Sequence, residues 1–325
     1  EGKDLSNLME ENKERELSDE RLLKLTEEAK EMGVARILIT GGGEPFIRKS
    51  IVLQMMERIK QNNIFGNLNT NGTLLNGEEI NRIVGMNWDL IMFSMDGPNA
   101  KVHDYLRGVS GTFEEATQNL IRFKKVKKEF NSKKPEIAFN TVITEKNYRY
   151  LPELFEYAND MDCNNLTLIP LLNPEEYRNL TIKNKGDLID VLNSALNVAE
   201  KHSIHTNINE AKEHFLSTDK SKNDQKENLG MDEEKPEHFF NISCFEPFLN
   251  MVVKMDGEVT PCCMIDDGPN LNRKSLSEIW HGEYYNNLRE EFRTFNVPSS
   301  CSKCILSKEK RNEELRKKLD DTNFK

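Results

Sequence analysis

The chain has 325 residues, of which 37% are hydrophobic and 31% charged, and its formal net charge at pH 7 is −10. This acidic balance argues against non-specific binding to DNA or to an anionic membrane surface, so we expect neither nucleic acid nor a membrane among its partners. No stretch approaches about 18 consecutive apolar residues, and the charged first residues do not resemble a signal peptide. We therefore expect a cytoplasmic protein.

The first two thirds of the sequence alternate short apolar strands with amphipathic helices. Apolar residues at helical spacing predict helices over 18–33, 49–61, 77–85, 112–129, 149–159 and 186–202. Short apolar runs predict strands over 35–40, 65–70, 89–94, 136–144 and 165–170. Continuously apolar strands separated by helices indicate βα units around a buried parallel sheet, which gives an α/β fold with five predicted strands.

The composition changes after this region. Residues 217–238 are almost wholly polar and charged, which is typical of a loop or linker. Beyond them, two apolar runs flank Asp256-Gly257, a hairpin signal, and helices are predicted over about 275–292 and 306–320. We predict three segments: a first domain over 1–212, a charged linker or loop over 213–238, and a small α+β domain over 239–325.

Polar or glycine-rich residues end successive predicted strands. They read TGGGEP at 40–45, NTNG at 69–72, SMDGP at 94–98, FNTVIT at 139–144 and LIPL at 168–171. In barrels of βα units the carboxyl ends of the strands meet at one mouth, where the chemistry takes place. Consecutive glycines let a ligand approach the backbone closely. Several such strand ends together therefore favour a cofactor site over an ordinary tight turn.

GGGEPF, TNG and SMDG, in this order and on these strands, resemble the radical S-adenosylmethionine (SAM) enzymes over roughly residues 18–210. The resemblance implies a (βα)6 TIM-like barrel, of which this chain would hold a part. It also implies a set of cofactor-binding residues: Gly42, Gly43, Glu44, Pro45, Asn71, Ser94, Asp96 and Arg107.

The resemblance assigns these residues to different parts of SAM. The GGEP segment would hold the amino end, largely through its backbone. Ser94 and Asp96 match a strand end expected to contact the ribose or the carboxylate, and Asn71 is a further candidate. Arg107 could pair its guanidinium fork with the methionine carboxylate. A surface salt bridge for Arg107 and a turn-capping role for Asp96 are the alternatives.

The catalytic [4Fe–4S] cluster of this family is held by a CxxxCxxC loop after the first strand, and the sequence contains no such triplet. By the resemblance, that loop should lie ahead of Glu1. Because the family barrel has one strand more than the five predicted here, we expect the first strand there as well. A natural variant that has lost the chemistry is the alternative.

Five of the six cysteines fall in the last quarter of the chain, and without a secretion signal they suggest metal ligands rather than disulfides. Four of them run Cys244-x17-Cys262-x38-Cys301-x2-Cys304. Four thiolates can hold a tetrahedral zinc or a [4Fe–4S] cluster. Cys263 is a spare thiol beside a ligand, and Cys163 is expected to be a small buried hydrophobe.

The cysteine spacing resembles the auxiliary-cluster domain called SPASM or, in its one-cluster form, twitch. The resemblance implies a single auxiliary [4Fe–4S] cluster held by Cys244, Cys262, Cys301 and Cys304. Since no cysteine follows Cys304, this centre should be closed by four protein ligands. That closure favours electron transfer over substrate ligation and leaves a structural role open.

The resemblance implies a radical enzyme, in which SAM yields a 5′-deoxyadenosyl radical that abstracts a substrate hydrogen and the auxiliary cluster accepts an electron. The one-cluster pattern resembles the 2-deoxy-scyllo-inosamine dehydrogenase type, which oxidises an aminocyclitol alcohol. Peptide or protein modification, as in RiPP or sulfatase maturation, is an alternative. An electron donor such as flavodoxin or ferredoxin is also implied. The alternative from another class is a non-catalytic iron–sulfur or zinc protein that binds SAM or a partner. The sequence assigns no catalytic residue.

Overall fold

The computed structural model describes residues 16–41, 43–171, 176–217, 244–304 and 306–321. The chain divides into two compact units, Val34–Lys220 and a second unit of Glu1–Gly33 with Ser221–Lys325. Most of the linker predicted over 213–238 lies outside the described residues, and its first residues belong to a helix. No helix in the described part of the chain is long and apolar enough to cross a bilayer.

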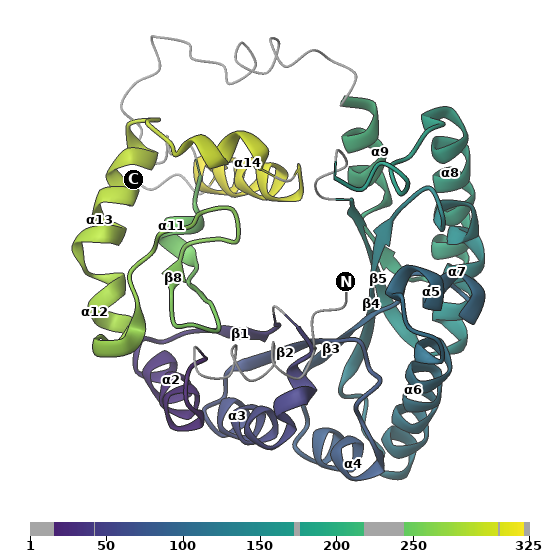
Figure 1. The fold of residues 1–325 in the computed structure, drawn as a ribbon, viewed down its shortest axis with the longest axis horizontal. Coiled ribbons are helices and arrows are strands. Elements are labelled where there is room, and N and C mark those ends of the chain that lie inside the picture. The colour runs from purple at the N-terminus through teal and green to yellow at the C-terminus, as the bar shows by residue number, and fades with distance from the viewer. Residues whose placement is uncertain (1–15, 42, 172–175, 218–243, 305, 322–325) are drawn as a thin grey trace, which may run out of the picture. The chain divides into compact units, whose positions relative to one another are not determined.

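The unit Val34–Lys220 is built on a six-stranded parallel sheet (Figure 1). Its strands follow the chain order: β1 Arg36–Ile39, β2 Phe65–Thr70, β3 Leu90–Ser94, β4 Glu136–Ile143, β5 Cys163–Pro170 and β6 His205–Thr206. Each neighbouring pair is parallel. The predicted α/β fold of βα units around a parallel sheet is confirmed.

The helices of this unit connect successive strands, except α9, which follows the last strand. They are η1 Pro45–Arg48, α3 Lys49–Gln61, α4 Gly77–Gly85, α5 Ala100–Arg107, α6 Thr112–Glu129, η2 Tyr148–Tyr150, α7 Leu151–Asp160, α8 Lys185–Lys201 and α9 Ile208–Ser217. Figure 1 shows α3, α4, α6, α7 and α8 along one face of the sheet. Because a parallel strand needs a crossover connection to its neighbour, this arrangement follows from the strand order.

The core of this unit lies between the sheet and those helices. Leu68, Ile91 and Phe139 on neighbouring strands are fully buried. Trp88 covers Gly66, where a Cβ would lie only 2.2 Å from the indole ring. Successive side chains of a strand point to opposite faces of the sheet. The residues that pack against the helices therefore determine which residues lie on the face away from the helices.

The strand β6 and the helices α5 and α9 were not predicted. β6 has two residues, which is too short to show a period, and it pairs with Asn165 and Leu166 of β5. The described sheet therefore has one strand more than the sequence indicated.

The second unit is smaller and irregular. Its elements are α2 Asp19–Glu31, α11 Glu246–Leu249, β7 Val252–Val253, β8 Val259–Thr260, η3 Leu271–Arg273, α12 Leu276–Trp280, α13 Glu283–Arg293, η4 Ser299–Lys303 and α14 Leu306–Asp321. The predicted hairpin is present, with β7 and β8 antiparallel. Gly257 adopts a φ of 85° in its turn, a conformation that glycine takes without strain.

The single helix predicted over 275–292 is wrong. The chain forms α12 and α13 instead, and the break falls at His281-Gly282. A Cβ on Gly282 would lie 2.7 Å from the carbonyl oxygen of Glu278, so a close turn replaces the helix there. The helix α2 packs against α12, since the carboxylate of Glu28 accepts a hydrogen bond from the backbone N–H of Leu276 at 2.8 Å.

Candidate functional site

The glycine run follows β1, and its two described glycines differ in what surrounds them; Gly42 lies outside the described residues. A Cβ on Gly41 would lie 2.9 Å from the carbonyl oxygen of Gly43, so the loop itself requires that glycine. A Cβ on Gly43 would meet no neighbouring atom within 4 Å, and its φ is not in the left-handed region. Neither packing nor backbone conformation in the described structure therefore explains a glycine at position 43.

The carboxylate of Glu44 joins the loop after β1 to the end of β2. Its Oε1 accepts hydrogen bonds from the Phe46 N–H at 3.2 Å and the Thr70 hydroxyl at 2.6 Å. Its Oε2 accepts the N–H of Asn71 at 2.7 Å. Pro45 begins the short helix η1 directly after it. The side chain of Glu44 thus positions the loop, which leaves the loop backbone as the surface open to a ligand.

The side chain of Asn71 holds the turn that follows β2. Its Oδ1 accepts hydrogen bonds from the backbone N–H of Thr73 at 2.9 Å and from the Thr73 hydroxyl at 2.8 Å. This local bonding pattern is common for Asn in turns. The strand ends that the sequence singled out as GGGEP and NTNG are therefore adjacent, and Glu44 is the link between them.

Asp96 and Arg107 form an ion pair at the end of β3. The Nη2 of Arg107 lies 2.9 Å from Oδ2 of Asp96, and Asp96 Oδ1 accepts the N–H of Val142 on β4 at 2.9 Å. Asp96 is only 6% exposed, and this burial raises the pKa of its carboxyl group, against the Arg107 charge and the Val142 hydrogen bond that lower it. Asp96 therefore bridges two strands and a helix rather than capping a turn.

Arg107 retains hydrogen-bonding capacity beyond this pair. Its side chain is 30% exposed, and its Nε is buried without a hydrogen-bond partner in the described structure. A guanidinium presents five N–H donors in a fixed fork. The pairing with Asp96 therefore does not use up the donors that a ligand carboxylate would need.

His103 on α5 supports the backbone of Asp96. Its Nδ1 accepts the Asp96 N–H at 3.1 Å, and the ring is 1% exposed. Burial, together with the nearby charge of Arg107, lowers the pKa of His103 to about 4. The imidazole is therefore neutral in the folded protein above that pH.

This buried neutral imidazole predicts a loss of stability in mild acid. The unfolded chain binds a proton on His103 near pH 6.5, whereas the folded chain binds it only near pH 4. As the pH falls through this window, the free energy of unfolding should drop by up to about 3 kcal/mol from this residue alone. Urea unfolding of the chain and of His103→Gln, whose amide oxygen can still accept the Asp96 N–H, measures the difference. Equal pH slopes for the two proteins would contradict it.

Polar side chains line the sheet face opposite the helix-covered core. Asn140 on β4 donates from Nδ2 to Oδ1 of Asn69 at 3.1 Å, and Asn69 donates from Nδ2 to the Thr40 hydroxyl at 3.5 Å. Ser94 is the register partner of Asn140 on the neighbouring strand. These residues extend from β1 to β4, and only Ser94 among them was predicted as a site residue. Asn140, Asn69 and Thr40 all stand in the strand-end segments quoted above, FNTVIT, NTNG and TGGGEP, but the hydrogen bonds that join them depend on the fold.

Three of the four predicted cysteine ligands share one apolar cluster in the second unit. Cys262, with Phe245, is buried in its core, and Cys244 and Cys301 pack against that core. Burial raises the pKa of Cys301 to about 11, with further contributions from Cys262 and Cys244. Segments distant in sequence therefore bring these thiols into one neighbourhood.

The remaining cysteines differ in how exposed they are. Cys304 follows η4 and is half-buried, whereas Cys263 is exposed. Cys163 is buried in β5, where burial raises the pKa of its thiol to about 12. Within the described ranges, no three His, Cys, Asp or Glu side chains are gathered as a site for a single metal ion. A [4Fe–4S] cluster holds its four cysteines farther apart, since iron and sulfide lie between them.

The polar groups around these thiols suit a sulfur-rich anionic group. Cys244 Sγ accepts hydrogen bonds from the Glu246 N–H at 3.5 Å and from Asn312 Nδ2 at 3.3 Å. Tyr284 packs against the same apolar cluster, and its buried hydroxyl has no hydrogen-bond partner in the described structure. Cysteine ligands with nearby N–H and O–H donors are the donor set that iron–sulfur clusters use. The residues present therefore fit the group.

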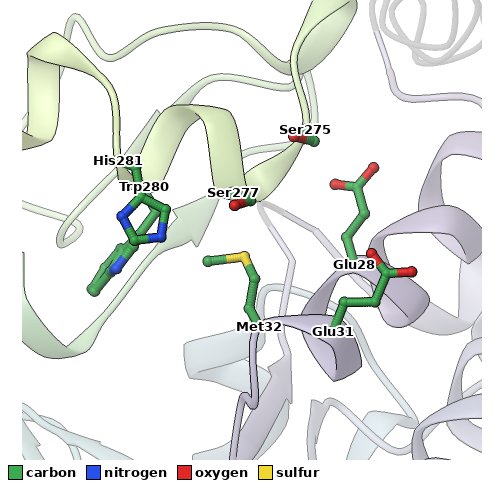
Figure 2. A pocket seen from close by; sticks show the side chains of 7 residues that line it. All are labelled: Glu28, Glu31, Met32, Ser275, Ser277, Trp280 and His281. Atoms are coloured by element: carbon green, nitrogen blue, oxygen red, sulfur yellow. The ribbon is translucent and has the colours of Figure 1, made fainter.

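A pocket of about 450 Å³ lies elsewhere in the second unit, between α2 and α12 (Figure 2). Figure 2 shows Glu28 and Glu31 of α2, with Met32 directly after that helix, across from Ser275 and Ser277. The carboxylate of Glu28 also accepts two hydrogen bonds from Arg21, at 2.8 and 3.3 Å. Because that carboxylate is already bonded within the protein, the pocket is a consequence of how α2 packs, and it contains none of the predicted site residues.

Comparison with known families agrees with both halves of this description. The sequence model of the radical SAM superfamily matches residues 6–158, and that of the SPASM iron–sulfur cluster-binding domain matches residues 244–305. The second match begins at Cys244 and includes Cys304. The chain belongs to the radical SAM enzymes that carry a SPASM domain. SAM and [4Fe–4S] clusters are the cofactors of these two domains.

Several curated proteins are similar to the chain. A tungsten-containing aldehyde ferredoxin oxidoreductase cofactor-modifying protein of Pyrococcus furiosus is 25% identical over 320 residues, covering 91% of this chain and 81% of that protein. A cysteine-type anaerobic sulfatase-maturating enzyme of Clostridium perfringens is 32% identical over 143 residues, covering 41% of this chain and 36% of that enzyme.

Solved structures share the fold. SuiB of Streptococcus suis, bound to S-adenosylmethionine, matches with a TM-score of 0.62 at 15% identity, covering 89% of this chain. The match covers 65% of SuiB, so this chain spans about two thirds of that protein's length. SuiB bound to the precursor peptide SuiA matches with a TM-score of 0.63. At this identity the likeness concerns the fold alone.

Proposed function

We propose that the protein oxidises its substrate by radical hydrogen abstraction and passes one electron to an auxiliary [4Fe–4S] cluster held by Cys244, Cys262, Cys301 and Cys304. The observation that carries the proposal is the shared apolar cluster around Cys244, Cys262 and Cys301 in the C-terminal unit. Bound SAM, with a reduced catalytic cluster, supplies the radical that removes the hydrogen atom. The substrate radical then loses an electron and a proton, which completes a two-electron oxidation.

The proposed SAM site uses the strand ends. The backbone of Gly42, Gly43 and Pro45 would hold the amino end, with Glu44 fixing the loop through its bonds to β2. Arg107 would pair with the carboxylate while Asp96 holds the guanidinium in place. Ser94 and Asn71 would contact the cofactor at the neighbouring strand ends. The open space at Gly43 supports this assignment, because a ligand approaching the backbone would fill it.

We propose an alcohol or aminocyclitol-like molecule as the substrate. The amide and hydroxyl groups of Thr40, Asn69 and Asn140 support it, since they offer donors and acceptors to a polar molecule on one face of the sheet. Peptide modification is the second candidate, and it is favoured by the sequence similarity to a sulfatase-maturating enzyme. We also propose an electron donor such as flavodoxin or ferredoxin. The proposed location is the cytoplasm, where free thiols such as those of this chain stay reduced.

The experiment is an anaerobic assay of protein in which a CxxxCxxC segment supplies the catalytic cluster. With SAM and a reductant, candidate alcohols and peptides are compared for formation of 5′-deoxyadenosine. A dehydrogenated product lighter by a pair of hydrogen atoms supports the oxidation. Formation of 5′-deoxyadenosine with peptides alone supports the second candidate. SAM binding without any 5′-deoxyadenosine would instead indicate a non-catalytic binding protein.

A further inference from the structure

Two polar side chains lie against the proposed auxiliary cluster without being ligands. Asn312 is on α14, beyond the residues that match the SPASM domain, and it is 6% exposed. Its Nδ2 donates to Cys244 Sγ at 3.3 Å, and its Oδ1 accepts the N–H of Phe245 at 2.8 Å. One amide therefore fixes both the sulfur and the backbone that follows it.

Tyr284 on α13 approaches the same cysteines from another side. Its side chain packs against the apolar cluster that contains Cys262, and its hydroxyl is buried without a hydrogen-bond partner in the described structure. A buried hydroxyl that bonds to nothing destabilises the folded protein, because it has lost its hydrogen bonds to water. A hydrogen-bond acceptor other than the described protein residues would therefore stabilise the Tyr284 hydroxyl.

The nearby carboxylate of Glu258 does not serve as that acceptor. Its Oε1 accepts the N–H of Gly268 at 2.6 Å, and its Oε2 pairs with Lys254 at 2.6 Å. The adjacent Tyr285 differs as well, because its hydroxyl donates to the carbonyl oxygen of Asn250 at 3.3 Å. The two neighbouring tyrosines of α13 thus differ in hydrogen bonding: the Tyr285 hydroxyl has a partner in the protein, and the Tyr284 hydroxyl has none in the described structure.

We propose that the Tyr284 hydroxyl and the Asn312 amide donate hydrogen bonds to sulfur atoms of the auxiliary cluster and raise its reduction potential. The proposal rests on the cluster assignment of the proposed function. A reduced cluster carries one more negative charge than an oxidised one, so a donor aimed at its sulfur stabilises the reduced form more. In apolar surroundings such bonds are stronger than in water. Both residues are positioning residues that ease the transfer of an electron from the substrate radical.

The test is a potentiometric titration of the anaerobically reconstituted chain, followed by the electron paramagnetic resonance of the reduced cluster. Tyr284→Phe should keep the full iron content and shift the midpoint potential to lower values. Tyr285→Phe is the matched control and should leave the potential unchanged. Asn312→Asp keeps an acceptor for the Phe245 N–H while replacing the donor with a negative charge, so it should shift the potential lower still.

Three outcomes would overturn the proposed tuning of the reduction potential. A Tyr284→Phe or Asn312→Asp protein with full iron and an unchanged potential would overturn the proposal while leaving the cluster assignment intact. Loss of the cluster from either variant would indicate a structural role and would also overturn it. An unmodified chain that binds no iron would overturn the cluster assignment itself, and the tuning role with it.

Discussion

Replacing Cys262 with alanine should remove the iron–sulfur cluster from the chain, whereas replacing the adjacent Cys263 should leave it in place. Cys262 is buried in the apolar cluster beside Cys244 and Cys301, and Cys263 is exposed. Loss of one of four ligands leaves an iron atom open and weakens the cluster, so iron in the Cys262→Ala protein should fall well below the about four atoms expected per unmodified chain. Iron analysis and the cluster's visible absorbance measure this directly.

The same pair of variants should also differ in stability. Metal binding at a four-cysteine centre is coupled to folding of the segment around it, so Cys262→Ala should leave the C-terminal unit open to proteolysis. Cys263→Ala should be as resistant as the unmodified chain. If Cys262→Ala retains its iron while Cys263→Ala loses it, then Cys263 and not Cys262 is the ligand.

Gly43→Val should abolish SAM binding and leave the fold largely unchanged. A side chain at this position meets no neighbouring atom of the described structure, and the backbone does not need glycine's left-handed conformation. The valine would instead occupy the space that the amino end of SAM is proposed to fill. Anaerobic calorimetry on protein that includes the expected CxxxCxxC segment measures the affinity.

Gly77→Val is a matched control, because a Cβ at the first residue of α4 also meets nothing within 4 Å. It should bind SAM as the unmodified protein does. An unchanged affinity in Gly43→Val would refute the proposed role of the glycine run. A fall in its thermal stability beyond that of the control would show that packing, and not a ligand, requires Gly43.

The sequence predicted the regular elements of the sheet closely. The helix over 49–61, the helix over 77–85 and the strand over 65–70 are observed with the same bounds. Long apolar periods are a strong signal because burial on one face repeats along the whole element. The two-residue strand β6 and the break at Gly282 carry no such period, and both depend on contacts with residues distant in the chain.

The candidate site was predictable in its residues but not in its bonds. The glycine run and Asp96 stand out because they follow predicted strands, whereas Arg107 was assigned through the family resemblance. That Glu44 bonds to Thr70, and that Asp96 pairs with Arg107, depends on how β1, β2, β3 and α5 meet in space. Asn312 and Tyr284 gave no sequence signal, since neither lies in a motif and each acts only through its place beside the cysteines.

The central claim is that the C-terminal cysteines hold one auxiliary [4Fe–4S] cluster, and the most direct measurement is the metal content of the chain after anaerobic reconstitution. Iron and sulfide analysis with Mössbauer spectroscopy should find about four iron atoms per chain in a single [4Fe–4S] environment. Only Cys163 lies outside the C-terminal group, and one thiolate cannot anchor a second cluster. About eight iron atoms per chain, or a single zinc in their place, would contradict the account.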